Sequence, residues 1–210
     1  MYRAAHHPAV KAISRVRISA LTFVLFSAVW LASGALQPAC AQSATAEYKV
    51  KAAFLFHFAQ LVDWPPGALG SGDQSINLCI FADEPRLREL QDSLDGKLVG
   101  ARVLHVLLLS SPQSAQGCNM LFLSHDEVRR QATILGSLRG QPVLTVGESE
   151  NFLSDGGMIQ LHLEEDKVRF DINAGLADSS HLKISSRLLL LATTVMLRDG
   201  QGRERLSSAH

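Results

Sequence analysis

"INLCIFADEPRLRELQDSLDGKLVGARVLHVLLL", residues 76–109, is the stretch that decides the fold class. It opens with a short apolar run, residues 76–82, which is bounded by turn-forming residues and predicts a buried strand. Pro85 then starts a short polar helix that we expect to end at Leu94. The apolar residues 101–109 predict the next strand. Two buried strands separated by a helix are typical of a parallel sheet.

The pattern repeats toward the C-terminus. "CNMLFLS" (118–124) and "PVLTVGE" (142–148) predict two further strands, and a helix closed by Gly140 is expected between them, over residues 126–138. Buried strands that alternate with helices imply a mostly parallel sheet with helices on both faces. We therefore expect residues 42–197 to form a single-domain α/β fold, a three-layer α/β/α sandwich.

The pattern changes after Gly157. "MIQLHLEEDKVRFDIN" (158–173) contains two alternating runs around a polar turn, which predicts a hairpin that extends the sheet. In the second run, one face consists of apolar side chains that we expect to point to the core, namely Val168, Phe170 and Ile172. The opposite face is expected to be exposed and consists of Arg169, Asp171 and Asn173.

Two further helices flank these elements. "AEYKVKAAFLFHFAQLVDW" (46–64) has apolar residues at helical spacing and ends before Pro65. This helix is apolar almost all round, so it is either sandwiched in the core or partly covered by a partner. "ISSRLLLLATTVML" (184–197) predicts a last helix capped by Ser185, and residues 198–210 are expected to form a flexible polar tail.

The first 41 residues have the features of a secretory signal peptide. Residues 1–17 contain four basic residues and no acid, and residues 18–32 are apolar and uncharged. This apolar run is shorter than the roughly 20 residues that cross a bilayer, so an uncleaved membrane anchor is the less favoured alternative. Small residues around Cys40 favour cleavage after Ala41. Lipidation of Cys40 is the other alternative, although Gln37 stands where that signal requires an aliphatic residue.

Removal of this leader makes the chain acidic. The full sequence has 20 basic and 20 acidic residues, and the part after Ala41 keeps 16 basic and 20 acidic residues, a net charge of −4. A mildly acidic domain without a basic stripe is a poor candidate for nucleic-acid binding.

Two cysteines remain after the leader, Cys79 and Cys118. In an oxidising compartment a disulfide between them is the default expectation, and two buried free thiols are the alternative. Such a bond would close a loop of about 40 residues and stabilise the fold by roughly 3 to 4 kcal/mol.

The sequence contains little that indicates catalysis. We find no nucleophile elbow, no phosphate-binding glycine loop and no zinc-binding helix motif. "SHDE" (124–127) has acid–base residue types but lies where a strand meets a helix, which favours capping. His57 lies on an apolar helical face and is expected to be a hydrogen-bonded core histidine. The loop after the fourth strand could form a ligand pocket, because small ligands bind where such strands end, with Gly147, Glu148 and Ser149 as its residues.

The order and spacing of these segments resemble the YfiR family of periplasmic proteins. The resemblance runs from about Tyr48 to Leu197, and the segments that carry it are "KAAFLFHFAQLVDWP", "INLCIFAD", "GKLVGARVLHV", "CNMLFLS", "PVLTVGES", "GGMIQLHLEEDKVRFDIN" and "LKISSRLLLLA".

This resemblance implies a regulator with no catalysis, no cofactor and no metal. Such proteins bind the periplasmic part of an inner-membrane diguanylate cyclase and repress cyclic-di-GMP synthesis, which disfavours biofilm formation. An outer-membrane lipoprotein of OmpA/Pal type can sequester the repressor, and envelope or redox stress is expected to release the cyclase. The resemblance also implies a homodimer.

The resemblance assigns roles to particular residues. Cys79 and Cys118 match the family's cysteine pair. Some members have a second pair within the region that corresponds to residues 147–160, and this chain has none there, so redox sensing through that second pair does not carry over. The segment "VRFDIN" matches the most distinctive late motif, and the expected partner-binding residues are Arg169, Asp171, Asn173 and Arg187.

Two other classes of function stay open. One is a periplasmic small-molecule binding or sensor protein that uses the pocket around Glu148. The other is an envelope hydrolase built on His125, Asp126 and Glu127.

Overall fold

The computed structural model describes residues 39–69, 75–81, 85–109, 111, 115, 117–198 and 204–208. The chain divides into two compact units, Met1–Ala39 and Cys40–His210, and the fold below belongs to the second unit. Most of the predicted signal peptide lies outside the described residues. Helix α2 begins at Ala39, so the residues on both sides of the predicted cleavage point are helical.

Nine strands of the described residues form one sheet, in the order β11-β10-β8-β7-β6-β5-β2-β4-β3. Their bounds are β2 Ser75–Phe81, β3 Leu98–Val99, β4 Arg102–Leu109, β5 Met120–Leu123, β6 Leu144–Gly147, β7 Ile159–Glu164, β8 Lys167–Asn173, β10 Thr194–Arg198 and β11 Glu204–Ser208. The central strands β4, β2, β5, β6 and β7 are parallel. The mostly parallel sheet predicted from the sequence is confirmed.

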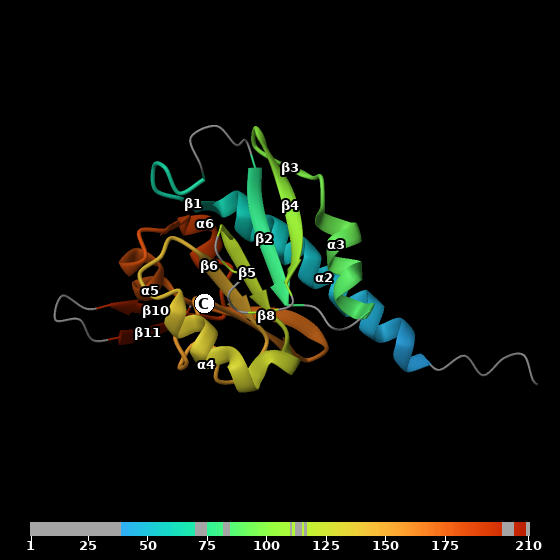
Figure 1. The fold of residues 1–210 in the computed structure, drawn as a ribbon. Coiled ribbons are helices and arrows are strands. Elements are labelled where there is room, and N and C mark those ends of the chain that lie inside the picture. The colour runs from blue at the N-terminus through green and yellow to red at the C-terminus, as the bar shows by residue number, and fades with distance from the viewer. Residues whose placement is uncertain are drawn as a thin grey trace, which may run out of the picture. The chain divides into compact units, whose positions relative to one another are not determined.

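Helices cover both faces of this sheet (Figure 1). Helices α2 (Ala39–Leu61) and α3 (Pro85–Leu94) pack on one face. The 3-10 turn η3 (His125–Glu127) leads into α4 (Val128–Ser137), which packs on the other face. The predicted α/β sandwich with helices on both sides is therefore confirmed.

The alternation of side chains along β2 separates two hydrophobic cores. Leu78 and Ile80 belong to the larger core under α2 and α3, whereas Cys79 and Phe81 belong to the smaller core under α4. Successive residues of a strand point to opposite faces, so a strand buried on both sides must be apolar throughout. This explains why β2 is an unbroken apolar run.

Helix α2 buries one stripe of side chains against the sheet. Its buried residues are Tyr48, Lys51, Ala52, Leu55, Phe58 and Ala59. His57 is exposed, and its Nδ1 lies 3.2 Å from Gln60 Oε1, so the prediction of a core histidine is wrong. Within residues 46–61 of α2, the large apolar side chains other than Val50 are buried or partly buried within the chain, which favours the sandwiched alternative over cover by a partner.

The predicted hairpin is confirmed. Strands β7 and β8 pair antiparallel through a two-residue turn, Glu165 and Asp166, in which both residues have positive φ, 49° and 59°. Phe170 and Ile172 are buried in the larger core, and the rings of Phe58 in α2 and Phe170 meet edge to face with centroids 5.2 Å apart.

The predicted helix over residues 184–197 is wrong. The helix α6 spans only Ser186–Leu189, capped as predicted by Ser185, whose Oγ accepts a hydrogen bond from Arg187 N at 3.3 Å. The chain then forms β10 parallel to β8. Adjacent β-branched residues disfavour a helix there, and the edge of β8 offers backbone partners, as the bond from Thr193 N to Phe170 O shows.

Four smaller elements complete the fold. Helix α5 (Ala174–Ser179) follows β8. Strands β1 (Val62–Asp63) and β9 (Lys183–Ile184) form a separate two-stranded antiparallel sheet. Strand β11 pairs with β10, so the predicted tail contains one strand of the main sheet.

Candidate functional site

A cavity of about 330 Å³ lies where β5, β6 and β7 end. Its walls come from four separate parts of the chain: Glu47 and Lys51 of α2, His125 after β5, Glu148 and Glu150 after β6, and Leu161, His162 and Leu163 of β7. The carboxyl ends of parallel strands meet at one edge of a sheet, and ligands of α/β proteins commonly bind at that edge. We call it the carboxyl-edge cavity.

A buried ion pair forms the inner wall of this cavity. Lys51 Nζ lies 2.7 Å from Glu148 Oε1, and both side chains are only 8% exposed. Glu47, one helical turn before Lys51, also pairs with the ammonium, and Tyr48 Oη donates to Glu148 Oε2 at 3.5 Å. Lysine is seldom buried unless it is paired, so the two carboxylates account for the position of Lys51.

Only one of the three predicted pocket residues lines the carboxyl-edge cavity. That residue is Glu148. A Cβ on Gly147 would collide with the ring of Phe152, so this glycine is required for packing. Ser149 is buried and donates to Gln131 Oε1 at 2.6 Å.

The residues of the hydrolase alternative do not form one site. His125 lines the carboxyl-edge cavity, but Asp126 and Glu127 are not among its lining residues. Glu127 is buried and accepts two hydrogen bonds from Arg130, at 2.9 and 3.0 Å. Ser124 occupies the N-cap position of η3, but its side chain makes no cap hydrogen bond.

The outer face of the hairpin adjoins this cavity through His162. The His162 Nδ1 atom lies 3.4 Å from Asp171 Oδ2, on the neighbouring strand. Farther along the same face, Arg169 Nε lies 3.6 Å from Glu164 Oε2, with both side chains about half exposed. We call these four residues the polar hairpin face. The structure thus places the predicted pocket residue Glu148 and the predicted partner residues Arg169 and Asp171 in one region.

Two of the predicted partner residues are less exposed than expected: the Asp171 side chain is only 20% exposed, and Asn173 departs furthest from the expectation. Its side chain was expected to be exposed, but it is buried, and this expectation is wrong. The Oδ1 atom accepts a hydrogen bond from Leu176 N at 2.9 Å and caps helix α5. Arg187, the fourth residue, is exposed in α6.

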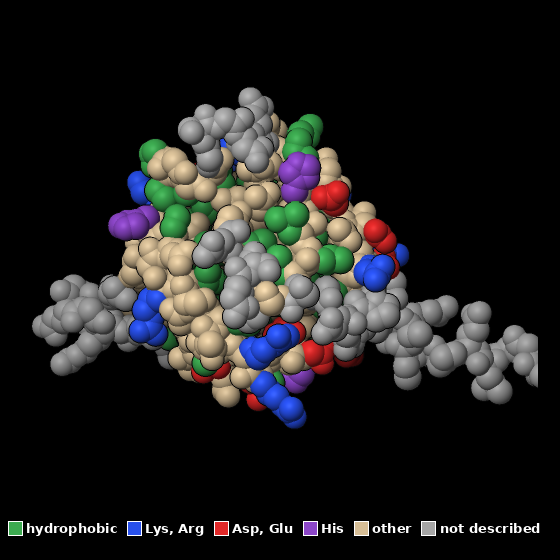
Figure 2. Space-filling model, in the orientation of Figure 1, with side chains coloured by type: hydrophobic (Ala, Val, Ile, Leu, Met, Phe, Trp, Pro, Cys, Tyr) green, Lys and Arg blue, Asp and Glu red, His purple; other side chains and the backbone are tan. Residues whose placement is uncertain are grey.

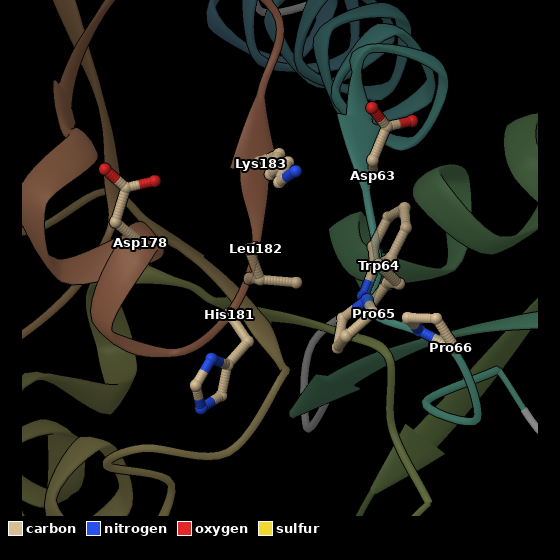
Figure 3. A pocket seen from close by; sticks show the side chains of 8 residues that line it. All are labelled: Asp63, Trp64, Pro65, Pro66, Asp178, His181, Leu182 and Lys183. Atoms are coloured by element: carbon tan, nitrogen blue, oxygen red, sulfur yellow. The ribbon is translucent and has the colours of Figure 1, made fainter.

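A second cavity, of about 490 Å³, lies between β1 with its following turn and the segment that leads into β9 (Figure 3). One wall contains Trp64, Pro65 and Pro66, and Asp178 and His181 approach from the opposite side. Trp64 is held by a hydrogen bond from Nε1 to Asn119 O at 3.2 Å. The sequence indicated Trp64 and Pro65 only as the end of the first helix, and it gave no role to Asp178 or His181.

The predicted disulfide is present. Cys79 in β2 and Cys118 just before β5 are bonded, with their Cα atoms 5.8 Å apart, and both are buried. The bond links β2 to the residue pair that leads into its neighbour β5, at the face covered by α4.

The described surface carries charges of both signs. Figure 2 shows basic side chains interspersed with acidic ones on one face. Within the described residues, no group of three or more histidine, cysteine, aspartate or glutamate side chains could hold a metal ion. No helix in that part of the chain is both long and apolar enough to cross a membrane.

Comparison with known proteins gives one match. A family model described as YfiR/HmsC-like matches residues 48–193, which cover the fold from α2 through α6. No curated protein matches the chain.

Proposed function

The chain belongs to the YfiR/HmsC-like family, whose members are periplasmic regulators of cyclic-di-GMP signalling, and from this membership we propose that it represses a diguanylate cyclase. The repressor binds the periplasmic domain of that inner-membrane cyclase and lowers cyclic-di-GMP synthesis. An OmpA/Pal-type outer-membrane lipoprotein competes for the repressor. The observation that carries the proposal is the extent of the family match, which includes every central strand of the sheet.

We place the cyclase contact on the polar hairpin face. Arg169 and Glu164 are about half exposed there, and their long side chains can exchange their mutual ion pair for partner groups at little cost, because exposed ion pairs contribute only about 0 to 1 kcal/mol. Arg187 supplies a second exposed cation. Asn173 acts indirectly, since its cap holds α5 at the end of β8.

Co-purification from the cell envelope tests this proposal. An affinity-tagged, exported chain should retain an inner-membrane protein that carries a diguanylate cyclase domain. The Arg169→Glu variant should lose that protein, whereas Arg129→Glu, the same charge reversal at an exposed position of α4, should keep it. If both variants retained the cyclase, Arg169 would not be part of the interface. If the wild-type sample contained no cyclase, the proposal would be contradicted.

A second function, small-molecule sensing, is favoured by the carboxyl-edge cavity. At about 330 Å³ it has the size of ligand sites in proteins, roughly 300 to 1,000 Å³, and it contains buried charged groups. A ligand that binds the folded state must raise its thermal stability. A thermal shift with a candidate ligand would therefore support sensing in addition to repression.

A further inference from the structure

We propose that a third cavity, between the end of α4 and helix α5, binds a small organic carboxylate. Its volume is about 450 Å³, within the range of roughly 300 to 1,000 Å³ that ligand sites in proteins have. Its walls come from the turn after α4, the loop after β6, the end of β8, and α5 with the residue that follows it. We call it the α4–α5 cavity. The inference does not depend on whether the chain represses a cyclase.

The charge of this cavity is positive. Arg139 is the single charged residue among its described lining residues, and it is exposed. It lies just after α4, and Gly140 follows it with a φ of 74°, the left-handed conformation in which helices often end. The guanidinium makes no hydrogen bond or ion pair with any residue that the structure describes. Its planar fork of N–H groups matches the two oxygens of a carboxylate.

A buried hydroxyl without a partner lines the same cavity. Ser180 is 1% exposed, and its Oγ makes no hydrogen bond within the described part of the chain. The other two serines of the wall differ from it. Ser154 Oγ donates to Asn151 O at 2.9 Å. Ser179 Oγ donates to Gly175 O at 2.7 Å. Buried polar groups are normally hydrogen-bonded, so the Ser180 hydroxyl points to an absent partner.

The absent partner is a hydrogen-bond acceptor. The cavity lies at the C-terminal ends of two helices, where main-chain carbonyls are in excess, but carbonyls of both helices are already occupied. Gln141 Nε2 donates to Ser137 O at 2.8 Å, and Ser180 N donates to Leu176 O at 3.1 Å. The groups left for a ligand are the Arg139 guanidinium and the Ser180 hydroxyl. A carboxylate can accept hydrogen bonds from both.

The remaining walls favour an organic anion over an inorganic one. Leu153 and Leu176 are partly buried and provide apolar surface for a short hydrocarbon chain. No acidic residue is among the lining residues that the structure describes, so no carboxylate of the wall repels the ligand. A carboxylate on a short apolar chain matches both the donors and the leucines.

Calorimetry on the exported protein with isovalerate as the probe tests the proposal. We expect saturable binding at one site per chain, together with an increase in Tm. Isovaleramide has the same carbon chain without the charge and should bind roughly tenfold more weakly. Absence of saturable isovalerate binding at millimolar concentration, or equal binding of the amide, would overturn the proposal.

An arginine variant places the ligand in the cavity. Arg139→Gln should raise the Kd for isovalerate roughly tenfold, because it removes the charged donor. Arg129→Gln, the same charge change at an exposed position of α4, should leave the Kd unchanged. An unchanged Kd in Arg139→Gln would locate the site elsewhere and overturn the proposal.

Ser180→Ala separates a binding role of the hydroxyl from a structural one. It should raise the Kd for isovalerate roughly fivefold and yet raise the Tm of the ligand-free protein, because it removes a buried hydroxyl that has no partner among the described residues. Ser154→Ala removes a hydroxyl of the same wall that is already bonded to the main chain, and it should leave the Kd unchanged. Wild-type affinity in Ser180→Ala would contradict the role of this hydroxyl and, with it, the proposal.

Discussion

At the scale of single residues, the packing of Phe152 determines which residues of the loop after β6 are free to line a cavity. Its ring is fully buried between Gly147 and Gly157, and a Cβ on either glycine would overlap it. Packing therefore explains Gly147, which the sequence suggested as part of a ligand pocket. Glu148, the next residue, turns toward Lys51 instead.

Gly147→Ala should destabilise the fold, because overpacking of a well-packed core costs about 1–3 kcal/mol. Phe152→Leu introduced into the same chain should reduce that cost, so the double variant should be more stable than the sum of the two single effects. Urea unfolding measures these free energies. Gly136→Ala in α4, where a Cβ meets open space, is the control and should stabilise the fold by about 0.5–1 kcal/mol. Simple additivity of Gly147→Ala and Phe152→Leu would contradict this account.

The buried pair of Lys51 and Glu148 gives a second prediction at this scale. Lys51→Met should lower the free energy of unfolding by about 3 kcal/mol, since it leaves a buried carboxylate without its cation. The double variant Lys51→Met, Glu148→Gln removes both charges and should be more stable than Lys51→Met alone. Urea unfolding compares them, and a double variant less stable than Lys51→Met would rule out the uncompensated charge as the cause.

At the scale of elements, the sequence predicted what depends on local pattern. The apolar run of β2, the proline that starts α3 and the alternation of the β7–β8 hairpin were all sufficient to place those elements. The pattern of the segment after Ser185 was not sufficient, because an apolar run has the same pattern in a helix and in a strand. Pairing with the edge of β8 makes residues 194–198 a strand.

The residues of the carboxyl-edge cavity were likewise only partly predictable from local sequence pattern. Glu148 was predicted from its position after a strand, but its partner Lys51 depends on which stripe of α2 faces the sheet. The sequence placed His57 on an apolar face of this helix, yet His57 is exposed. Contacts between distant segments depend on such helical phase, which a nearly all-apolar helix does not specify.

The disulfide is the element-scale feature with the clearest test. Cys79→Ser or Cys118→Ser should destabilise the fold by roughly 3 to 4 kcal/mol and weaken repression, because the bond restrains the unfolded chain. Urea unfolding of oxidised and reduced wild-type protein measures the same difference. Reductant should have no effect on the double variant Cys79→Ala, Cys118→Ala. Equal stability of oxidised and reduced wild-type protein would contradict the prediction.

At the scale of the whole molecule, the fold combines a disulfide-bonded, buried centre with a polar edge. The disulfide and two cores hold β2 and β5, while the polar hairpin face and the carboxyl-edge cavity lie toward β7 and β8. His162 belongs to both of these surfaces. A ligand in the cavity would thus contact a residue of the face where we place the cyclase. If the ligand bound the free repressor and the cyclase-bound repressor with different affinities, ligand binding and cyclase binding would be coupled.

The central claim, repression of a cyclase from the periplasm, is tested most directly by cellular cyclic-di-GMP. The nucleotide is measured in cells that lack this protein and in cells restored with the full chain or with a version missing residues 2–41. We predict that cyclic-di-GMP rises on deletion and that only the full chain reverses the rise. The control is that the wild-type strain contains the folded protein in its periplasm. If it does, an unchanged cyclic-di-GMP level after deletion would contradict the claim.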